Sequence, residues 1–190
     1  MRLVLATRND HKLREFGRLL GGERLEALPD DVLLPPETGT TFAENALAKA
    51  RAAAEATGRA ALADDSGIEA EALGGAPGIY SARYAGPDAT DAENLAKLRA
   101  EAPAGSRLRY VCAVAFVDSS GVEHTVEGTC TGAMAPEPRG ERGFGYDPVF
   151  VPDDGDGTRT MAELSDAEKD RISHRGRAAR ALAAWLDGRR

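Results

Sequence analysis

Hydrophobic positions in the first third of the chain follow the spacing of a strand and then that of a helix. Residues 2–7, RLVLAT, form a short and largely apolar run that predicts a buried strand. Residues 29–40 are rich in Pro, Asp, Thr and Gly and predict a loop. Between them, apolar side chains on one helical stripe predict a helix that ends at Gly21-Gly22; they are Leu13, Phe16, Leu19 and Leu20.

Three Ser/Thr-x-x-Glu motifs predict helix starts, because their side chains can cap the first backbone N–H groups reciprocally. They begin at Thr41, Thr90 and Ser165 and predict helices over 41–58, 90–102 and the region 165–188. In the last region, the sequence SHRG at 173–176 breaks the helical pattern and is expected to open a new helix.

The strand patterns are found mainly in the middle of the chain. Residues 59–75 predict a strand, a sharp turn at ADDSG and a second short strand. Residues 107–132 predict a hairpin of two long strands joined by DSSG, and residues 135–152 a loop that enters a strand. Early alternation of strands and helices followed by a long hairpin predicts an α/β fold with a mixed sheet. No repeat or linker divides the sequence, so residues 1–190 are expected to form one domain.

Composition and charge narrow the classes of partner. The 190 residues include 42% hydrophobic residues, and the formal net charge is −7. An acidic chain argues against a nucleic-acid binder, although a small anionic ligand can still be held by local cations or a metal. No apolar stretch has the length of a membrane span or of a signal peptide, so a cytoplasmic protein is expected. Cys112 and Cys130 are expected to be buried free thiols.

The segment ATRNDHK, residues 6–12, follows the first predicted strand and opens a helix. Thr7, Asn9 and the backbone N–H groups of a helix start can donate to phosphate oxygens, and Lys12 adds a positive charge. The alternative is that Asn9 only caps the helix and that Lys12 is solvated.

The stretch ADDSG carries two adjacent carboxylates. Side chains of a strand alternate between faces, so Asp64 and Asp65 are expected to point to opposite sides. A carboxylate at a strand end is a good Mg²⁺ ligand and can accept a proton from water. A plain Asx turn at residues 65–67 is the alternative. Glu37 is a candidate second metal carboxylate, while Lys49, on a predicted helix, would ordinarily lie on the surface.

Two later segments carry aromatic and cationic side chains. In GFGYDP, residues 143–148, Phe144 could stack on a flat ring and Asp147 could accept its hydrogen bonds. In EKDRISHRG, residues 168–176, Lys169, His174 and Arg175 gather near a predicted helix start. A turn that covers the edge of the core and a solvated helix start are the alternatives.

These pieces occur together in one family. The chain resembles the Ham1/RdgB family of inosine triphosphate pyrophosphatases through LATRNDHKLREF, ETGTTFAENALAKA, ADDSGIEAEALGGAPGIYSARYAG, GFGYDPVF and MAELSDAEKDRISHRGRA. The resemblance implies hydrolysis of ITP, dITP and XTP to the monophosphate and pyrophosphate, with Mg²⁺ as cofactor. It also implies a long mixed sheet with two α/β lobes flanking a nucleotide-binding cleft, a nucleotide as the small-molecule partner, no nucleic-acid or membrane partner, and a homodimer.

The resemblance also implies roles for individual residues. Glu37 and Asp65 would bind Mg²⁺, and Asp65 would position or deprotonate the attacking water. The resemblance places Arg175 in the base pocket, and its permanently charged guanidinium, with several N–H donors, makes it the candidate donor to the 6-keto oxygen of the purine. The substrate-binding residues implied are Thr7, Arg8, Asn9, Asp10, His11, Lys12, Lys49, Ser66, Phe144, Gly145, Tyr146, Asp147, Lys169, His174 and Arg175.

Two alternatives and one departure stay open from the sequence. A Maf-like nucleotide pyrophosphatase would share the general architecture, and a non-catalytic nucleotide-binding protein would bind without turnover. The family usually has Gly where this chain has Arg8, and an Arg side chain there could add a phosphate contact or crowd the loop.

Overall fold

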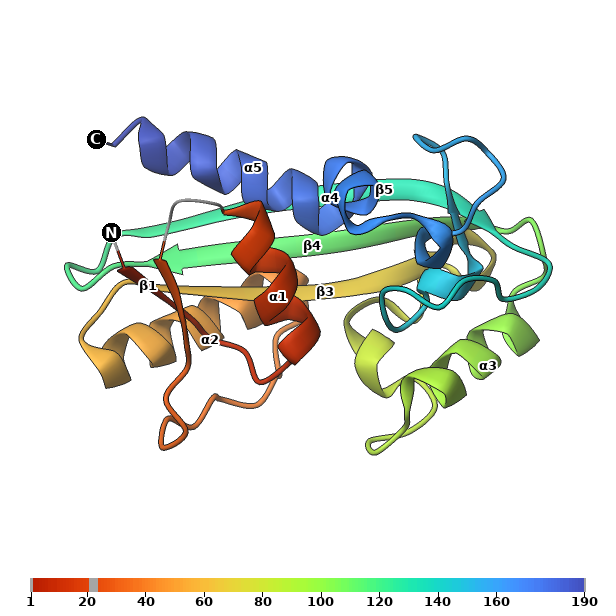
Figure 1. The fold of residues 1–190 in the computed structure, drawn as a ribbon. Coiled ribbons are helices and arrows are strands. Elements are labelled where there is room, and N and C mark those ends of the chain that lie inside the picture. Colours follow the sequence, from red (N-terminus) through yellow and green to blue (C-terminus); the bar gives the residue numbers. More distant parts are fainter. Residues whose placement is uncertain (1, 21–23, 190) are drawn as a thin grey trace. The chain divides into compact units, whose positions relative to one another are not determined.

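The computed structural model describes residues 2–20 and 24–189 (Figure 1). The predicted end of the first helix at Gly21-Gly22 lies outside the described residues. Six strands form one sheet in the order β2-β1-β3-β4-β5-β6. The strands are β1 (Arg2–Leu5), β2 (Arg24–Ala27), β3 (Ala61–Ala70), β4 (Arg107–Val117), β5 (Glu123–Met134) and β6 (Phe150–Pro152). The α-helices are α1 (Asp10–Leu19), α2 (Phe42–Thr57), α3 (Asp91–Glu101), α4 (Asp166–Ile172) and α5 (His174–Asp187).

The sheet mixes strand directions. β1 is parallel to both β2 and β3, whereas β5 and β6 are antiparallel. β4 and β5 are neighbours in the sheet, and the Asp118 N–H closes the turn between them by donating to the carbonyl of Val122 at 3.0 Å. The predicted α/β class, the mixed sheet and the long hairpin are confirmed.

The chain divides into two compact units. Unit 1 comprises residues 1–65, 112–128 and 175–190, and unit 2 comprises residues 66–111 and 129–174. Three strands, β3, β4 and β5, contribute residues to both units.

In unit 1, α1 and α5 share a hydrophobic core with the strands. Phe16 of α1 and Leu182 of α5 are fully buried beside Leu62 of β3 and Val114 of β4. Helix α2 contributes small buried side chains, which let it approach the sheet closely; they are Ala46, Ala50, Ala53 and Ala54. In unit 2, α3 and α4 bury Leu98 and Ile172 in a second core with Ile68, Tyr110 and Phe150.

The predicted helix starts are confirmed. Thr41, Thr90 and Ser165 each complete a capping box with the Glu three residues later. The predicted break at SHRG is also confirmed, because α4 ends at Ile172 and α5 begins at His174.

The predicted turn at ADDSG is wrong. β3 runs without interruption from Ala61 to Ala70, and a short 3₁₀ helix, Glu71–Leu73, follows in place of a second strand. Asp, Ser and Gly are poor strand residues, but the partners of Asp64 and Asp65 described below outweigh that local preference. The short strand β2 was not predicted either. Among the described residues, no helix combines the length and the apolar character that a membrane span requires.

Candidate active site

The start of α1 presents the side chains predicted to hold phosphate, and two of them bind the backbone. The Asn9 Oδ1 accepts from the N–H groups of His11 and Lys12 at 2.9 and 3.2 Å, and Thr7 Oγ1 accepts from the Asn9 N–H at 3.1 Å. Asn9 is therefore the N-cap of α1, but Lys12 is not a solvated side chain as the alternative interpretation has it, because its Nζ lies 3.0 Å from the Asp64 carboxylate. Asp10 and His11 are exposed, and the His11 ring contacts Arg14.

Arg8 extends toward the loop that follows β2. Its guanidinium donates to the carbonyls of Leu28, Pro29 and Val32 at 2.9, 2.7 and 2.8 Å. The Arg8 side chain thus ties this loop to the start of α1.

Asp64 is the centre of a buried ionic group. Its carboxylate is fully buried and lies 3.0 Å from Lys12 Nζ and 3.5 Å from Arg175 Nη2. Arg175 is itself buried and also donates to Glu15 of α1. Burial opposes ionisation of Asp64, but Lys12, Arg175 and Lys49 hold its pKa well below its usual range. The negative charge of Asp64 is therefore stabilised by cationic side chains from α1, α2 and α5.

Asp65 has different partners. Its Oδ2 accepts from the side-chain Nδ2 of Asn45, on α2, at 2.9 Å. Adjacent carboxylates that bind different helices agree with the predicted alternation of faces along the strand. Burial raises the pKa of Asp65, and the negative charge of Glu37 adds to this effect. The positive charge of Lys49 opposes both.

Lys49 lies among the carboxylates. It is 7% exposed, so the expectation of an ordinary surface lysine is wrong. Its Nζ lies 2.6 Å from Glu37 Oε1. Burial alone would lower the pKa of Lys49, but Asp64, Asp65 and Glu37 together raise it. The protein therefore places one ammonium group where three carboxylates concentrate negative charge. We call Lys12, Glu37, Lys49, Asp64 and Asp65 the carboxylate–lysine cluster.

The donor set of this cluster suits a hard divalent cation. Glu37 and Asp65 offer carboxylate oxygens, and the cluster already attracts a positive group, Lys49. Across the described part of the chain, no group of three or more His, Cys, Asp or Glu side chains could hold a metal by itself. Mg²⁺ needs no such cage, because proteins usually bind it through one or two carboxylates, water and substrate phosphates.

Cys112 borders the cluster. Burial, followed by the charge of Asp64, raises the pKa of this thiol to about 12. Both cysteines are buried and free, as predicted.

In unit 2, Asp147 collects the second set of predicted residues. Its buried carboxylate lies 2.7 Å from Lys169 Nζ and accepts from the Tyr110 hydroxyl at 3.2 Å and the Phe144 N–H at 3.0 Å. The Lys169 ammonium also lies 5.3 Å from the centre of the Phe144 ring. We call Tyr110, Phe144, Asp147 and Lys169 the Asp147 group.

The loop before Asp147 depends on glycine. Gly143 has φ +73°, and a Cβ there would lie 2.0 Å from the Asp147 Oδ2. The next glycine, Gly145, donates its N–H to Asp91 at 2.8 Å, and the Tyr146 hydroxyl donates to the carbonyl of Ser81 at 2.7 Å. The loop is thus held on both sides of Phe144.

The remaining predicted residues fall in both units. His174 stacks on the Tyr110 ring at 4.5 Å, and Ser66 is half-buried on β3, both in unit 2. Arg175 belongs to unit 1 with Glu15 and Asp64, whereas Phe144 to Asp147 and Lys169 belong to unit 2.

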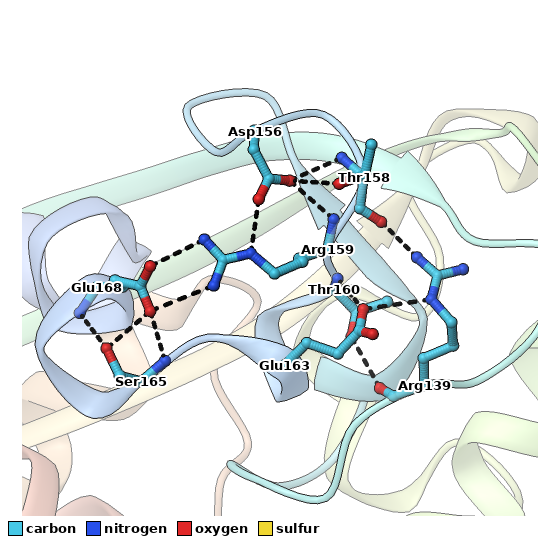
Figure 2. Close-up of polar contacts among 8 residues, drawn as sticks. All are labelled: Arg139, Asp156, Thr158, Arg159, Thr160, Glu163, Ser165 and Glu168. Carbon is cyan, nitrogen blue, oxygen red and sulfur yellow. Dashed lines mark hydrogen bonds and ion pairs between the residues drawn. The ribbon is translucent and has the colours of Figure 1, made fainter.

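Lys169 lies on α4, and ionic and hydrogen-bonding contacts hold the start of this helix. Figure 2 shows Arg159 reaching both Asp156 and Glu168, the residue next to Lys169. Glu168 also accepts from the N–H and hydroxyl of Ser165, at 2.8 and 2.7 Å. We call Asp156, Arg159, Ser165 and Glu168 the Arg159 network.

The sequence did not point to two buried polar residues that hold predicted site residues. Glu15 holds Arg175, and Asn45 holds Asp65. Asn45 had a detectable signal, since it lies four residues before Lys49 on an alanine-rich helix and so shares its face. Glu15 had none, because its partner is 160 positions away.

Comparison with known proteins decides the family. A sequence model described as the Ham1 family matches residues 3–185. The chain belongs to the Ham1 family. The Ham1 match spans both the carboxylate–lysine cluster and the Asp147 group, and it confirms the resemblance seen in the motifs.

Individual relatives and structures agree with the Ham1 assignment. A protein of Mycobacterium tuberculosis named dITP/XTP pyrophosphatase is 52% identical over 188 residues, covering 93% of this chain and 91% of its own. A protein of Frankia alni with the same name is 49% identical over 199 residues, covering 98% and 97%. The solved structure of a HAM1 protein from Coxiella burnetii matches with a TM-score of 0.86 and 42% identity over 99% of both chains.

Proposed function

We propose that this protein hydrolyses dITP, XTP and ITP to the nucleoside monophosphate and pyrophosphate, and so removes deaminated purines from the nucleotide pool. The observation that carries the proposal is the carboxylate–lysine cluster. It joins a carboxylate of raised pKa, Asp65, to two lysines that can face phosphate, in a chain whose Ham1 relatives bear the name dITP/XTP pyrophosphatase.

The triphosphate is assigned to unit 1. Lys12, Lys49 and the first turn of α1 supply positive potential to a substrate that carries about four negative charges. Because both lysines are paired with carboxylates in the structure, substrate phosphates would compete for the same ammonium groups.

Mg²⁺ is the proposed cofactor, and Glu37 and Asp65 would hold it. When bound, it would neutralise charge on the phosphates and on the leaving pyrophosphate. Asp65 is also the proposed acceptor for the proton of the attacking water, a role that carboxylates fill in general base catalysis.

The purine is assigned to the Asp147 group with Gly145, Tyr146, His174 and Ser66. The Phe144 ring offers a stacking surface, and Lys169 and Asp147 offer a donor and an acceptor. Arg175 is the proposed donor to the 6-keto oxygen, because a site built to satisfy that oxygen rejects an amine in its place. Glu15 and Asp64 fix its guanidinium.

The test is product analysis with purified protein and Mg²⁺. We expect dITP, XTP and ITP to give monophosphate and pyrophosphate, with ATP and GTP nearly unchanged. Diphosphate plus phosphate would place the attack at the γ-phosphorus and contradict the mechanism. Tight ITP binding without turnover would favour a non-catalytic nucleotide-binding protein, and a preference for modified pyrimidines would favour a Maf-like activity.

Three further expectations from the family resemblance are part of the proposal. They are a homodimer, a cytoplasmic location, and a single functional domain with a nucleotide-binding cleft. The strands shared by both units support the single domain. Sedimentation of the purified protein at several concentrations tests the dimer.

A further inference from the structure

Asn45 bonds the Asp65 carboxylate with one end of its side chain and the loop that carries Glu37 with the other. We propose that Asn45 is a positioning residue that fixes the Asp65 carboxylate and the loop carrying Glu37, and so prepares the pair for the metal. The inference rests on the proposed function, because the pair has this role only in that reaction.

The side-chain amide of Asn45 uses both of its ends. Its Nδ2 donates to Asp65 Oδ2 at 2.9 Å, and its Oδ1 accepts from the N–H of Gly39 at 2.8 Å. The residue is 2% exposed, so water cannot replace either bond easily. The Asn amide carries its donor and its acceptor on two separate atoms, so it can bond both groups at once.

The loop that carries Glu37 is anchored through consecutive backbone N–H groups. Gly39 donates to Asn45, and the next residue, Thr40, donates its N–H to Glu44 Oε2 at 2.6 Å. Glu44 also accepts from the N–H of Thr41 at 3.3 Å. The start of α2 thereby fixes the backbone only two residues after Glu37.

Close contact reinforces this anchoring. A Cβ at Gly39 would lie 2.7 Å from Asn45 Oδ1 and 2.8 Å from Glu44 Cβ. The loop therefore approaches α2 as closely as a glycine allows, and the Asn45 amide transmits its position to Asp65.

Asn94 provides a matched control within the same chain. Thr90 and Glu93 form a capping box before Asn94, as Thr41 and Glu44 do before Asn45, and Asn94 is also 2% exposed. Its amide accepts from the N–H of Ala85 at 2.8 Å and donates to the carbonyl of Ala82 at 3.1 Å. It therefore makes the same kinds of bond without touching a carboxylate.

The experiment compares Asn45→Ala with Asn94→Ala. Mn²⁺ binding without nucleotide, followed by electron paramagnetic resonance, and the Mg²⁺ concentration giving half-maximal dITP hydrolysis are measured together with the melting temperature. We expect both variants to melt at a lower temperature, while only Asn45→Ala weakens both metal readouts, by about 10–100-fold, as loss of a residue that orients a ligand does.

A second variant covers a failure of Asn45→Ala to fold. Gly39→Ala retains every polar side chain of the cluster but forces the loop and the Asn45 amide apart, so we expect weaker Mn²⁺ binding there too. Metal readouts within twofold of the wild type in both variants would overturn the inference, as would an equal change in Asn94→Ala. Wild-type protein that binds Mn²⁺ but does not hydrolyse dITP would refute the proposed function and leave the Mn²⁺ comparison valid.

Discussion

At the scale of single residues, Asp65 combines burial with a raised pKa and a neutral hydrogen-bond partner, Asn45. Replacing it by Asn removes the proposed proton acceptor and a metal ligand without creating an unpaired buried charge. We expect Asp65→Asn to lower kcat for dITP by about 10²–10⁴-fold. Circular dichroism melting should show an unchanged or higher melting temperature, and near-wild-type turnover would refute the role.

Substitution of the neighbouring Asp64 should instead lower the stability of the fold. Its carboxylate balances Lys12 and Arg175 in a fully buried position. Asp64→Asn removes the buried carboxylate that Lys12 and Arg175 share, so we expect a loss of roughly 3 kcal/mol in the free energy of unfolding, at the low end for a broken buried ion pair. Urea unfolding measures it. Equal stability of Asp64→Asn and Asp65→Asn would show that the two carboxylates are not distinguished in this way.

At the scale of elements, structure that depends on neighbouring residues follows from the sequence, whereas structure that depends on distant residues does not. The three capping boxes were predictable because each bond joins residues three positions apart. The turn expected at ADDSG did not form, because Lys12, Arg175 and Asn45, all distant in sequence, stabilise two aspartates within β3.

The candidate site also combines features that the local sequence predicts with features that depend on distant residues. The motifs singled out Glu37, Asp65 and Asp147 as candidate site residues. They gave no sign that Lys49 is buried, because its environment is made by carboxylates from β3 and from the loop at Glu37. Helical periodicity shows only which residues of α2 share a face with Lys49.

The Arg159 network makes the start of α4 sensitive to acid (Figure 2). Arg159 is the main cause that lowers the pKa of Glu168 from 4.5 to about 2. A carboxylate whose pKa is lower in the folded than in the unfolded protein stabilises the fold at pH values above its unfolded pKa. That stabilisation is lost as the pH falls toward its folded pKa. We therefore expect Arg159→Gln to lower the melting temperature slightly above pH 4.5, with the difference from wild type shrinking between pH 4.5 and 2.

The control for this prediction is Arg142→Gln, which removes an exposed arginine of unit 2 that lies outside the Arg159 network. It makes the same change in net charge. An equal and equally pH-dependent effect in both variants would mean that overall charge, and not the bonds to Glu168, sets the acid response.

At the scale of the whole molecule, the two units are continuous through three strands. β3 passes from unit 1 to unit 2 between Asp65 and Ser66, and β4 passes between Val111 and Cys112. Strands lose their ladder hydrogen bonds when either half unfolds. The units should therefore unfold together, although each has a core of its own.

A reporter in one unit and a mutation in the other test this coupling. Trp185, the one tryptophan of the chain, lies on α5 of unit 1, where His124 stacks on it at 4.0 Å. Leu98→Ala removes a fully buried side chain from the core of unit 2 and should cost about 2–5 kcal/mol. We expect Trp185 fluorescence and far-ultraviolet circular dichroism to shift to the same lower urea midpoint. A Trp185 midpoint that stays at the wild-type value, while the dichroism signal shifts, would mean that unit 1 unfolds independently of unit 2.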